Sequence, residues 1–502
     1  MCNCDFLEDA GLRGQFGAPV ILKGKTAIEI NPRYFAAKMI KSHNLIFFKN
    51  PGWHEWSSDG WVPVRECILQ SRIADLLQEE LRATFRLQKK AAQYSNRPVA
   101  NFGGVSIGEA GPSAPAYDLI STRTIGEILR TMRYMSDRGD NFPPLDPDVI
   151  PVQNGLLRFN AEMHDFEFRA YTQDDMVFYT LDVVYDSEAK SELFDKVLRE
   201  ILPDPEDRRV VQMYMGASLF SQNLTRKFMS FTGEGGSGKS VLLGLFSKIM
   251  TPARNFDLEI KDLTSDFGLS ALTTQTLITV SEAGKDEFCK GSGAAADFIK
   301  KFVGRDFFQT KRKNRNEKYN HEGVFSVIYV SNHPLKFEFE SDGEEFRSRL
   351  LPILFNKRIE NPNLTLGDEL LLPENRSAFF LWVLEGARLV RRSNWQIELS
   401  KEQVNRREKI IQATRGIELF VKNYIEKFET GYITTEEAYK KYDKLRRTDG
   451  YTFYHEGKFD RRLSEVMSDF GGEKDKNLPS ANGKKNARGY RGVRWKDVNK
   501  LK

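Results

Sequence analysis

The 502-residue sequence has few cysteines, no long hydrophobic run and no internal repeat. Its four cysteines, Cys2, Cys4, Cys67 and Cys289, are too few for a disulfide framework, and their spacing matches no zinc site. No run of about 18 uncharged apolar residues occurs, which argues against a membrane-spanning helix. The N-terminus lacks the basic and apolar segments of a secretory signal. We therefore expect a soluble intracellular protein with no membrane partner.

The apolar content of the sequence is sufficient for several packed cores. Hydrophobic residues make up 40% of the chain and include 36 Phe, 17 Tyr and 6 Trp, which excludes global disorder and fibrous repeats. At roughly 150 residues per domain, the length predicts about three domains.

Basic charge is concentrated at the C-terminal end of the chain. Residues 401–502 contain 25 Lys and Arg against 16 Asp and Glu, whereas the rest of the chain carries a net charge of −4. Such an asymmetry indicates a domain that binds a polyanion such as nucleic acid. The alternative is an ordinary solvated surface.

Composition and periodicity divide the chain into five segments. We expect a leader of weak character at 1–32, a mainly helical domain at 33–204, a core at 205–360, a helical lid or connector at 361–410 and a basic domain at 411–502. Between about Lys227 and Phe355, strand-like runs alternate with helical ones. This alternation is typical of an α/β fold with a largely parallel sheet.

A glycine-rich motif lies at the start of the core. Its residues are Gly233, Glu234, Gly235, Gly236, Ser237, Gly238, Lys239 and Ser240, which fit the pattern G-x-x-x-x-G-K-[ST] at every fixed position. A buried-strand run at 228–231 precedes the motif, and an amphipathic helix starting at Val241 follows it. Backbone N–H groups of such a loop bind phosphates, the lysine neutralises them and the Ser240 hydroxyl holds Mg²⁺. The motif therefore predicts a site for ATP and Mg²⁺.

Polar residues follow two further apolar strands of the core. Glu282 ends the run 277–281 and would polarise a water or bind Mg²⁺, although Ser281 stands where many P-loop enzymes have Asp. Asn332 follows the run 325–330 and would orient the attacking water. Each residue has a simpler alternative: an acid that merely ends a strand, and a turn-forming Asn before His333.

Taken in order, these motifs resemble the superfamily 3 helicases, in particular the phage and plasmid primase–helicase branch that includes the poxvirus enzyme. The resemblance runs from about Asn154 to Asp497 and includes the segments 154–157, 215–220, 267–272 and 300–306. It implies an AAA+-like P-loop ATPase core at 205–360, a primase–helicase type of N-terminal domain and a hexameric ring with ATP between subunits. It also implies travel along DNA from 3′ to 5′.

The resemblance further implies an arginine that completes the ATP site of a neighbouring subunit. Arg347 and Arg349 precede the apolar run 350–355. The family often has adjacent arginines at this place, so the choice between the two stays open, with Arg349 keeping the better spacing. Surface arginines are the alternative.

In the family, the stretch that residues 300–306 resemble leads into a hairpin that lines the ring's pore. Here it has five basic residues in eight positions, with a histidine beyond: Lys311, Arg312, Lys313, Arg315, Lys318 and His321. Such a hairpin would track the backbone of one DNA strand. A solvated hairpin is the alternative.

The basic C-terminal segment resembles the winged-helix domain of this branch. Thr434 to Glu437 form a capping-box sequence that starts one helix. The resemblance assigns DNA contacts to a recognition helix and a wing, here Lys458, Arg461, Arg462, Lys484, Lys485, Arg488, Arg491 and Arg494. A winged helix that contacts only proteins is the alternative.

We therefore expect an ATP-dependent DNA helicase that replicates a mobile genetic element or virus. Its partners would be single-stranded and duplex DNA, further copies of itself, and a separate primase or host replication proteins, all on DNA in the cytoplasm. We expect no primase activity, because the region before the core leaves no room for a primer-synthesising domain. An ATP-gated replication initiator or helicase loader uses the same site and stays open. The basic hairpin and the basic C-terminal domain disfavour a small-molecule kinase. The intact glycine-rich motif disfavours a structural DNA-binding protein.

Overall fold

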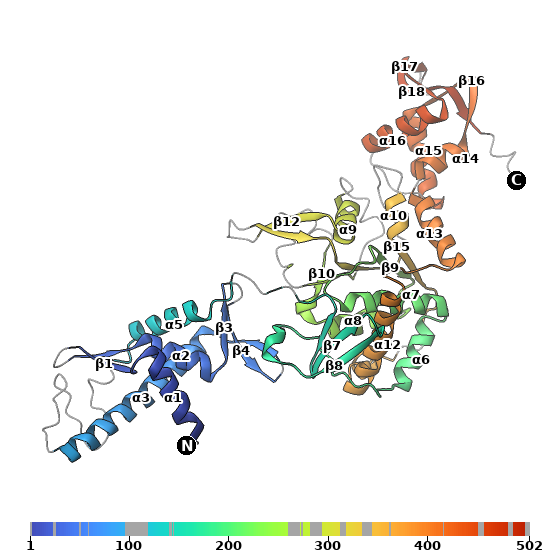
Figure 1. Ribbon diagram of the computed structural model, residues 1–502. Coiled ribbons are helices and arrows are strands. Elements are labelled where there is room, and N and C mark those ends of the chain that lie inside the picture. Colours follow the sequence, from blue (N-terminus) through green and yellow to red (C-terminus); the bar gives the residue numbers. More distant parts are fainter. Residues whose placement is uncertain are drawn as a thin grey trace. The chain divides into compact units, whose positions relative to one another are not determined.

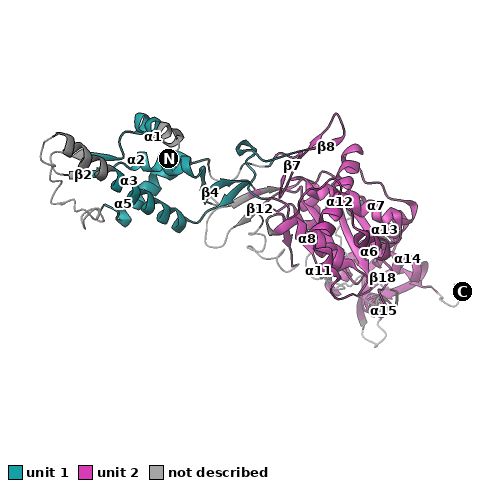
Figure 2. Ribbon diagram, turned by 90° about the horizontal axis from the view of Figure 1, so that it is seen from below, with its two compact units in different colours: residues 1–145, 169–179 teal, residues 146–168, 180–502 magenta. Residues whose placement is uncertain are grey.

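The computed structural model of the protein describes residues 3–23, 27–49, 52–58, 60–95, 119–139, 143, 145–259, 272, 275–281, 294–311, 318–333, 344–360, 363–414, 416–449, 456–479 and 485–496. The chain divides into two compact units (Figure 2). The N-terminal unit comprises residues 1–145 and 169–179, and the C-terminal unit comprises residues 146–168 and 180–502.

Among the described residues of the N-terminal unit, the helices are α1 (Asn3–Phe16), α2 (Pro32–Ser42), α3 (Glu66–Ser95) and α5 (Thr122–Ser136). Helix α2 begins where it does because the Asn31 side chain accepts the N–H groups of Arg33 and Tyr34. Pro32 takes the first helical position, which needs no N–H. Buried apolar residues of α2, α3 and α5 form the core of this unit.

Two small antiparallel sheets complete the N-terminal unit. One pairs β1 (Val20–Lys23) with β2 (Ala27–Ile30), and the other has β3 (Leu45–Phe48), β4 (Gly52–Ser57) and β5 (Gly60–Pro63) in that order; η1 (Gln173–Asp175) is a 3-10 turn. The second sheet lies in a region that we expected to be mainly helical. This sheet is held by two buried tryptophans: Trp53 belongs to the core formed with the helices, and Trp61 packs with Ile46 and Phe48. The residues that we expected to be a leader of weak character also contribute, since Leu12 and Ile30 belong to the core.

The C-terminal unit begins with three strands and two helices: β6 (Val149–Val152), β7 (Gly155–Asn160), β8 (Asp165–Arg169), α6 (Glu192–Ile201) and α7 (Pro205–Leu219). Ile150, Leu157 and Phe159 of these strands share one hydrophobic core with α6, α7 and the central sheet. This packing explains why the unit boundary lies near residue 145. The boundary that we expected at 204 falls inside the C-terminal unit.

The central sheet of the C-terminal unit has five parallel strands: β9 (Phe228–Gly233), β10 (Asn255–Asp257), β11 (Leu277–Val280), β14 (Ser326–Ser331) and β15 (Leu350–Phe355). Their order in the sheet is β10-β11-β14-β9-β15. Figure 1 labels β9, β10 and β15 of this sheet. Residues of β11, β14 and β9 are buried almost without interruption, as expected for a parallel sheet that is covered on both faces. The predicted α/β fold with a parallel sheet is confirmed.

Alternate residues of these strands enter two different cores. Met229 and Phe231 face the core that contains α7, α8 (Lys239–Arg254) and α12 (Pro373–Arg392). Phe228 and Val327 face the core that contains α9 (Ala294–Gly304). Helices therefore cover both faces of the sheet, and its strand ends carry the loops.

Further elements of the C-terminal unit surround the sheet. Strands β12 (Phe307–Lys311) and β13 (Lys318–Glu322) form an antiparallel hairpin, and α10 (Glu344–Arg349) leads directly into β15. Helices α11 (Leu366–Leu370) and α13 (Lys401–Thr414) complete this part. None of the helices within the described ranges is long and apolar enough to cross a membrane.

The last segment runs in the order α14 (Gly416–Tyr424), β16 (Ile425–Thr434), α15 (Thr435–Asp449), α16 (Glu456–Phe470), β17 (Glu473–Pro479) and β18 (Lys485–Trp495). The antiparallel sheet has the order β16-β18-β17, so the first strand pairs with the last. The predicted capping box is confirmed: the Glu437 N–H donates to Thr434 Oγ1, and the Thr434 N–H donates to Glu437 Oε2. The three helices and the sheet enclose a core of their own.

A single tyrosine hydroxyl connects α7 to two strands of the central sheet. Tyr214 is fully buried. Its hydroxyl accepts the Val327 N–H at 2.8 Å and lies 3.0 Å from the Lys227 carbonyl oxygen, just before β14 and β9 begin to pair. Burial raises the pKa of this hydroxyl, so it stays protonated. Without it, a buried backbone N–H would have no partner.

We expect Tyr214→Phe to destabilise the central sheet by about 1–3 kcal/mol, the cost of leaving a buried polar group unpaired. Amide hydrogen exchange of peptides that contain β14 would show faster exchange. Tyr134→Phe is the control, because that ring is 81% exposed. Equal protection of β14 in both variants would contradict the role of the hydroxyl.

Candidate functional site

The glycine-rich motif forms the loop between β9 and α8, as the sequence predicted. Strand β9 ends at Gly233, and α8 begins at Lys239. Gly233, Gly236 and Gly238 have φ values of 148°, 77° and 87°. These values lie in a region that other residues rarely adopt, which explains the glycines of the motif.

Neighbouring elements also pack closely against this loop. A Cβ atom at position 233 would overlap the carbonyl oxygen of Phe355, and one at position 238 would overlap Cγ2 of Ile201. The N–H of Ile359 donates to the Gly236 carbonyl oxygen at 3.0 Å. The loop is therefore shaped by α6 on one side and by the end of β15 on the other.

Lys239 is buried inside the loop, with 5% of its surface exposed. Its Nζ donates to the carbonyl oxygens of Gly233 at 2.8 Å and Glu234 at 2.7 Å, and to Ser237 Oγ at 3.1 Å. Burial lowers its pKa. No carboxylate of the described ranges pairs with it. The ammonium group is thus held by neutral oxygens, an arrangement that a polyanion would stabilise.

Residues at the ends of other parallel strands share the sheet edge that carries the loop. Asn332 directly follows β14, whose Ser331 pairs with Thr232 of β9, and the Asn332 side chain is exposed. Ser240 and Val241 lie in the first turn of α8, where Ser240 is exposed. Loop, amide and hydroxyl therefore gather at one edge, where ligands of parallel sheets bind.

An acid that the sequence did not single out lies at the same edge. Asp257 ends β10, and its Oδ1 accepts the hydroxyl groups of Ser281 at 2.8 Å and Thr279 at 3.1 Å. A carboxylate thus stands beside Ser281, the position where many P-loop enzymes have Asp. The predicted Glu282 lies outside the described residues. Within them, no group of three His, Cys, Asp or Glu side chains could hold a metal ion.

The two candidate arginines lie at the other end of the sheet. Arg347 and Arg349 belong to α10, directly before β15, and Leu350 pairs with Phe228 at the start of β9. The loop follows the opposite end of that strand, about 17 Å away at 3.3 Å per residue. The pair of strands thus separates both arginines from the loop of their own chain.

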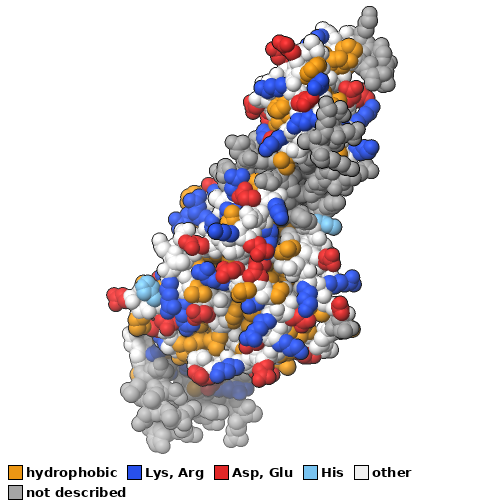
Figure 3. Space-filling view, turned by 90° about the vertical axis from the view of Figure 1, so that its right-hand side faces the viewer, with side chains coloured by type: hydrophobic (Ala, Val, Ile, Leu, Met, Phe, Trp, Pro, Cys, Tyr) orange, Lys and Arg blue, Asp and Glu red, His pale blue; other side chains and the backbone are white. Residues whose placement is uncertain are grey.

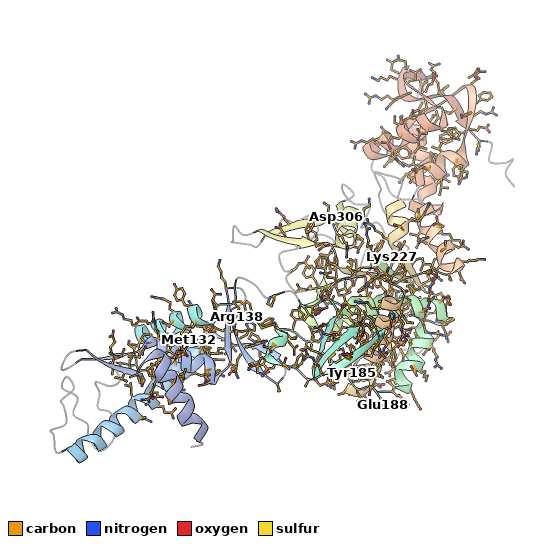
Figure 4. All side chains as sticks on the ribbon, in the orientation of Figure 1. Met132, Arg138, Tyr185, Glu188, Lys227 and Asp306 are labelled. Atoms are coloured by element: carbon orange, nitrogen blue, oxygen red, sulfur yellow. The ribbon has the colours of Figure 1, made fainter. Side chains whose placement is uncertain are left out.

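The two arginines differ in their contacts. Arg347 Nε lies 3.2 Å from Glu408 Oε2 of α13, whereas Arg349 Nη1 donates to the Lys300 carbonyl oxygen at 3.0 Å. Lys227 also lies here: its Nζ donates to the Ser348 carbonyl oxygen, and its position is labelled in Figure 4. Burial lowers the pKa of Lys227, and the charges of Arg407 and Arg349 add to the effect.

The predicted basic hairpin is present as β12 and β13. Lys311 pairs with Lys318, and His321 pairs with Phe308 in the register. At Lys311, Lys318 and His321 the structure describes the backbone alone. Arg312, Lys313 and Arg315 lie outside the described residues.

The predicted DNA-binding arginines of the C-terminal segment fall into two groups. Arg461 and Arg488 form the first group and are exposed. The second group forms ion pairs, although Arg491 and Arg494 in it are exposed too. Arg462 binds Glu418 and Glu465, Arg491 binds Asp475, and Arg494 binds Glu426 at 2.6 Å while lying 3.8 Å from the Phe428 ring centre. Lys458 and Lys485 are described by their backbone alone, and Lys484 is outside the described residues. On the face in Figure 3, basic and acidic side chains are likewise intermixed.

Sequence reasoning missed one lysine beside the predicted recognition helix. Lys474 of β17 donates to Ser464 Oγ of α16 at 3.1 Å. Burial raises the pKa of Asp460 in the same helix, and the charges of Lys474 and Arg488 oppose this shift. The charges of both cations therefore act on Asp460 of α16. Lys474 is identified only by the contact between β17 and α16, so no local sequence pattern could have identified it.

Two family models match separate parts of the chain. Residues 34–203 match a family described as D5 N terminal like, and residues 231–349 match a family of unknown function (DUF5906). The first match agrees with a primase–helicase type of N-terminal region. The second spans the loop, Asn332 and both candidate arginines. No curated protein matches the chain.

The chain is also similar to solved structures of the apo C-terminal region of NrS-1. One has a TM-score of 0.40 at 12% identity and covers 91% of this chain and 98% of that chain. Another, of residues 305–718, has a TM-score of 0.43 at 13% identity and covers 92% of this chain and 99% of that chain.

We expect Gly238→Ala to lower the thermal midpoint of the C-terminal unit, because the new Cβ would meet Ile201 at a positive φ. The cost should be about 1–3 kcal/mol. Gly235→Ala is the matched control from the same loop, since a Cβ there meets nothing within 4 Å. Equal midpoints for the two variants, measured by calorimetry, would contradict the confinement of Gly238 by Ile201.

Proposed function

We propose that the protein is a DNA helicase that hydrolyses ATP, assembles as a ring and separates DNA strands during replication of a mobile genetic element or virus. One observation carries this proposal. The phosphate-type loop follows one end of the β9–β15 pair, while Arg347 and Arg349 precede the other end. An ATP site that needs such an arginine must obtain it from a neighbouring copy of the chain.

The residues at the loop fit a nucleoside triphosphate. Backbone N–H groups at the start of α8 and the buried ammonium group of Lys239 offer positive charge where phosphates would lie. Mg²⁺ would neutralise phosphate charge, and the exposed Ser240 hydroxyl offers an oxygen ligand of the kind that it prefers. Asn332 and Glu282 would orient the attacking water.

Of the two arginines, Arg349 is the better candidate for the neighbour's ATP. Arg347 is paired with a carboxylate on α13, so it would have to give up an ion pair before it could bind a phosphate. Arg349 is bound to a neutral carbonyl oxygen, which is a weaker competitor. In this proposal Arg347 anchors α10 to α13 and Arg349 reaches the next subunit.

Two features support DNA as the partner. Strands β12 and β13 end and begin with paired lysines, Lys311 and Lys318, and the segment that connects them has three further basic residues. The last segment has the helix–strand–helix–helix–strand–strand order of a winged helix, with its first strand beside its last. We propose that the hairpin pulls one strand through a hexameric ring in the 3′ to 5′ direction, with a separate primase or host proteins supplying primers.

The trans arrangement predicts complementation between two inactive variants. Lys239→Ala removes the cation of the loop, and Arg349→Ala removes the neighbour's contact, so each should lower ATP-dependent separation of a forked duplex at least 100-fold. Mixed rings would contain some sites with both residues intact. An equimolar mixture should therefore regain a substantial part of the activity.

The outcomes of that mixture separate the alternatives. No recovery in mixed rings would contradict a trans arginine. If the unmodified protein showed DNA-stimulated hydrolysis without strand separation, an initiator or loader would replace the helicase. Full activity of Arg349→Ala would move the assignment to Arg347, for which Arg347→Ala is the direct test.

The contacts of the C-terminal arginines predict two classes of variant. Arg461→Ala with Arg488→Ala should weaken duplex binding and reduce the slope of log affinity against log salt by about 2, because each exposed arginine releases about one counterion. Arg494→Ala should leave the slope nearly unchanged, because its guanidinium is already paired with Glu426. Titrations at several salt concentrations measure both. An unchanged slope in the double variant would favour a domain that binds proteins.

A further inference from the structure

An exposed aromatic ring stands at the base of the β12–β13 hairpin. Phe307 is the first residue of β12 and has 79% of its surface exposed, although phenylalanine is among the residues most often buried. The next residue, Phe308, packs against Phe302 and Phe325 with ring centres 5.3 Å and 6.0 Å apart. Phe308 therefore attaches the strand to the core, and folding does not require the ring of Phe307.

The backbone around Phe307 is tightly held. The Arg305 N–H donates to the Gly323 carbonyl oxygen, and the Gly323 N–H donates to the Asp306 carbonyl oxygen, both at 3.0 Å. Arg305 has a φ of 69°, which is rare for a residue other than glycine. Figure 4 labels Asp306 at this place, where β12 begins. The hairpin base thus fixes the position of Phe307 next to an exposed arginine.

The register of the hairpin continues from Phe307 towards the basic tip. Alternate positions 307, 309 and 311 of β12 pair with Glu322, Asn320 and Lys318 of β13. Gln309 Nε2 donates to Asn320 Oδ1 at 3.0 Å, which ties the two strands together midway. Five basic residues lie between positions 311 and 318. The exposed ring and the basic segment are therefore two ends of one short element.

We propose that the ring of Phe307 stacks on a base of the single DNA strand whose phosphates the basic hairpin holds. This inference rests on the proposed function, because it takes single-stranded DNA as the hairpin's ligand. Basic side chains attract phosphates and do not touch the bases, whereas an aromatic ring offers a face to any base whatever its sequence. Charge and aromatic surface together make the element complementary to an unpaired strand.

The test compares two oligonucleotides with the same number of phosphates. One is oligo-dT, and the other has abasic sites in place of its bases. Phe307→Leu should bind oligo-dT about ten- to a hundredfold more weakly than the unmodified chain, the usual effect of losing one stacked base. It should bind the abasic strand equally well, with an unchanged salt slope, because no phosphate contact is lost. Fluorescence anisotropy with the full-length protein measures these affinities.

Three further variants test whether the aromatic ring itself is responsible for the difference between the two oligonucleotides. Phe307→Tyr keeps an aromatic face and should bind oligo-dT like the unmodified chain, whereas Phe307→Leu keeps apolar volume alone. In Phe307→Trp, the emission of the new indole should fall when oligo-dT binds and stay constant with the abasic strand. Leu364→Ala controls for the loss of an exposed apolar side chain elsewhere, since Leu364 is 93% exposed.

Three results would overturn the proposal. Phe307→Leu could bind both strands like the unmodified chain, or it could lose the same affinity for both. A changed molecular mass in solution would assign the ring to a contact between copies of the chain. None of these readouts needs ATP hydrolysis. A protein that shows base-dependent binding but separates no duplex would therefore refute the helicase and leave Phe307 as a stacking residue.

Discussion

Strands β9 and β15 are parallel neighbours in the central sheet. The segments that follow the two strands therefore lie side by side. The segments that precede them lie side by side at the opposite end, one strand length away. The phosphate-type loop and the segment after β15 therefore share one edge of the sheet, where Ile359 binds the Gly236 carbonyl oxygen. Arg347 and Arg349 share the opposite edge with the start of β9. This topology gives a single chain both the phosphate-type loop and the two arginines, but it keeps them at opposite ends of the β9–β15 pair.

The shape of the loop depends on residues far from it in the sequence. Gly233 is confined by Phe355 and Gly238 by Ile201, so the loop packs between β15 and α6. Helix α6 precedes the region that resembles an ATPase core, yet it belongs to the same hydrophobic core as α7, α8 and α12. A truncated chain that began at residue 205 would lose one wall of the loop together with much of that core.

Features set by adjacent residues could be predicted from the sequence, whereas contacts between distant residues could not. The strand and helix around the loop and the capping box at Thr434 are local patterns, and the structure contains them. The neutralisation of Arg462 by Glu418, 44 residues away, is invisible to a count of charges. The same holds for Asp257, which stands beside Ser281 because β10 and β11 are neighbours in the sheet. The excess of basic residues at the C-terminal end thus overstates the positive charge that is free of acidic partners.

Helix α13 connects these parts physically. Asp207 is buried and accepts hydrogen bonds from Gln403 and Arg406, and Arg406 also donates to the Pro352 carbonyl oxygen of β15 at 3.1 Å. Burial raises the pKa of Asp207, which the hydrogen bonds and the charge of Arg406 oppose. Removing one partner of such a buried pair typically costs about 3–5 kcal/mol, so α13 is firmly attached to the sheet. Glu408 of the same helix holds Arg347. Helix α13, which leads into the C-terminal segment, is therefore fixed to β15. Because Arg347 and Arg349 directly precede β15, a displacement of this strand must move α13 and the two arginines together.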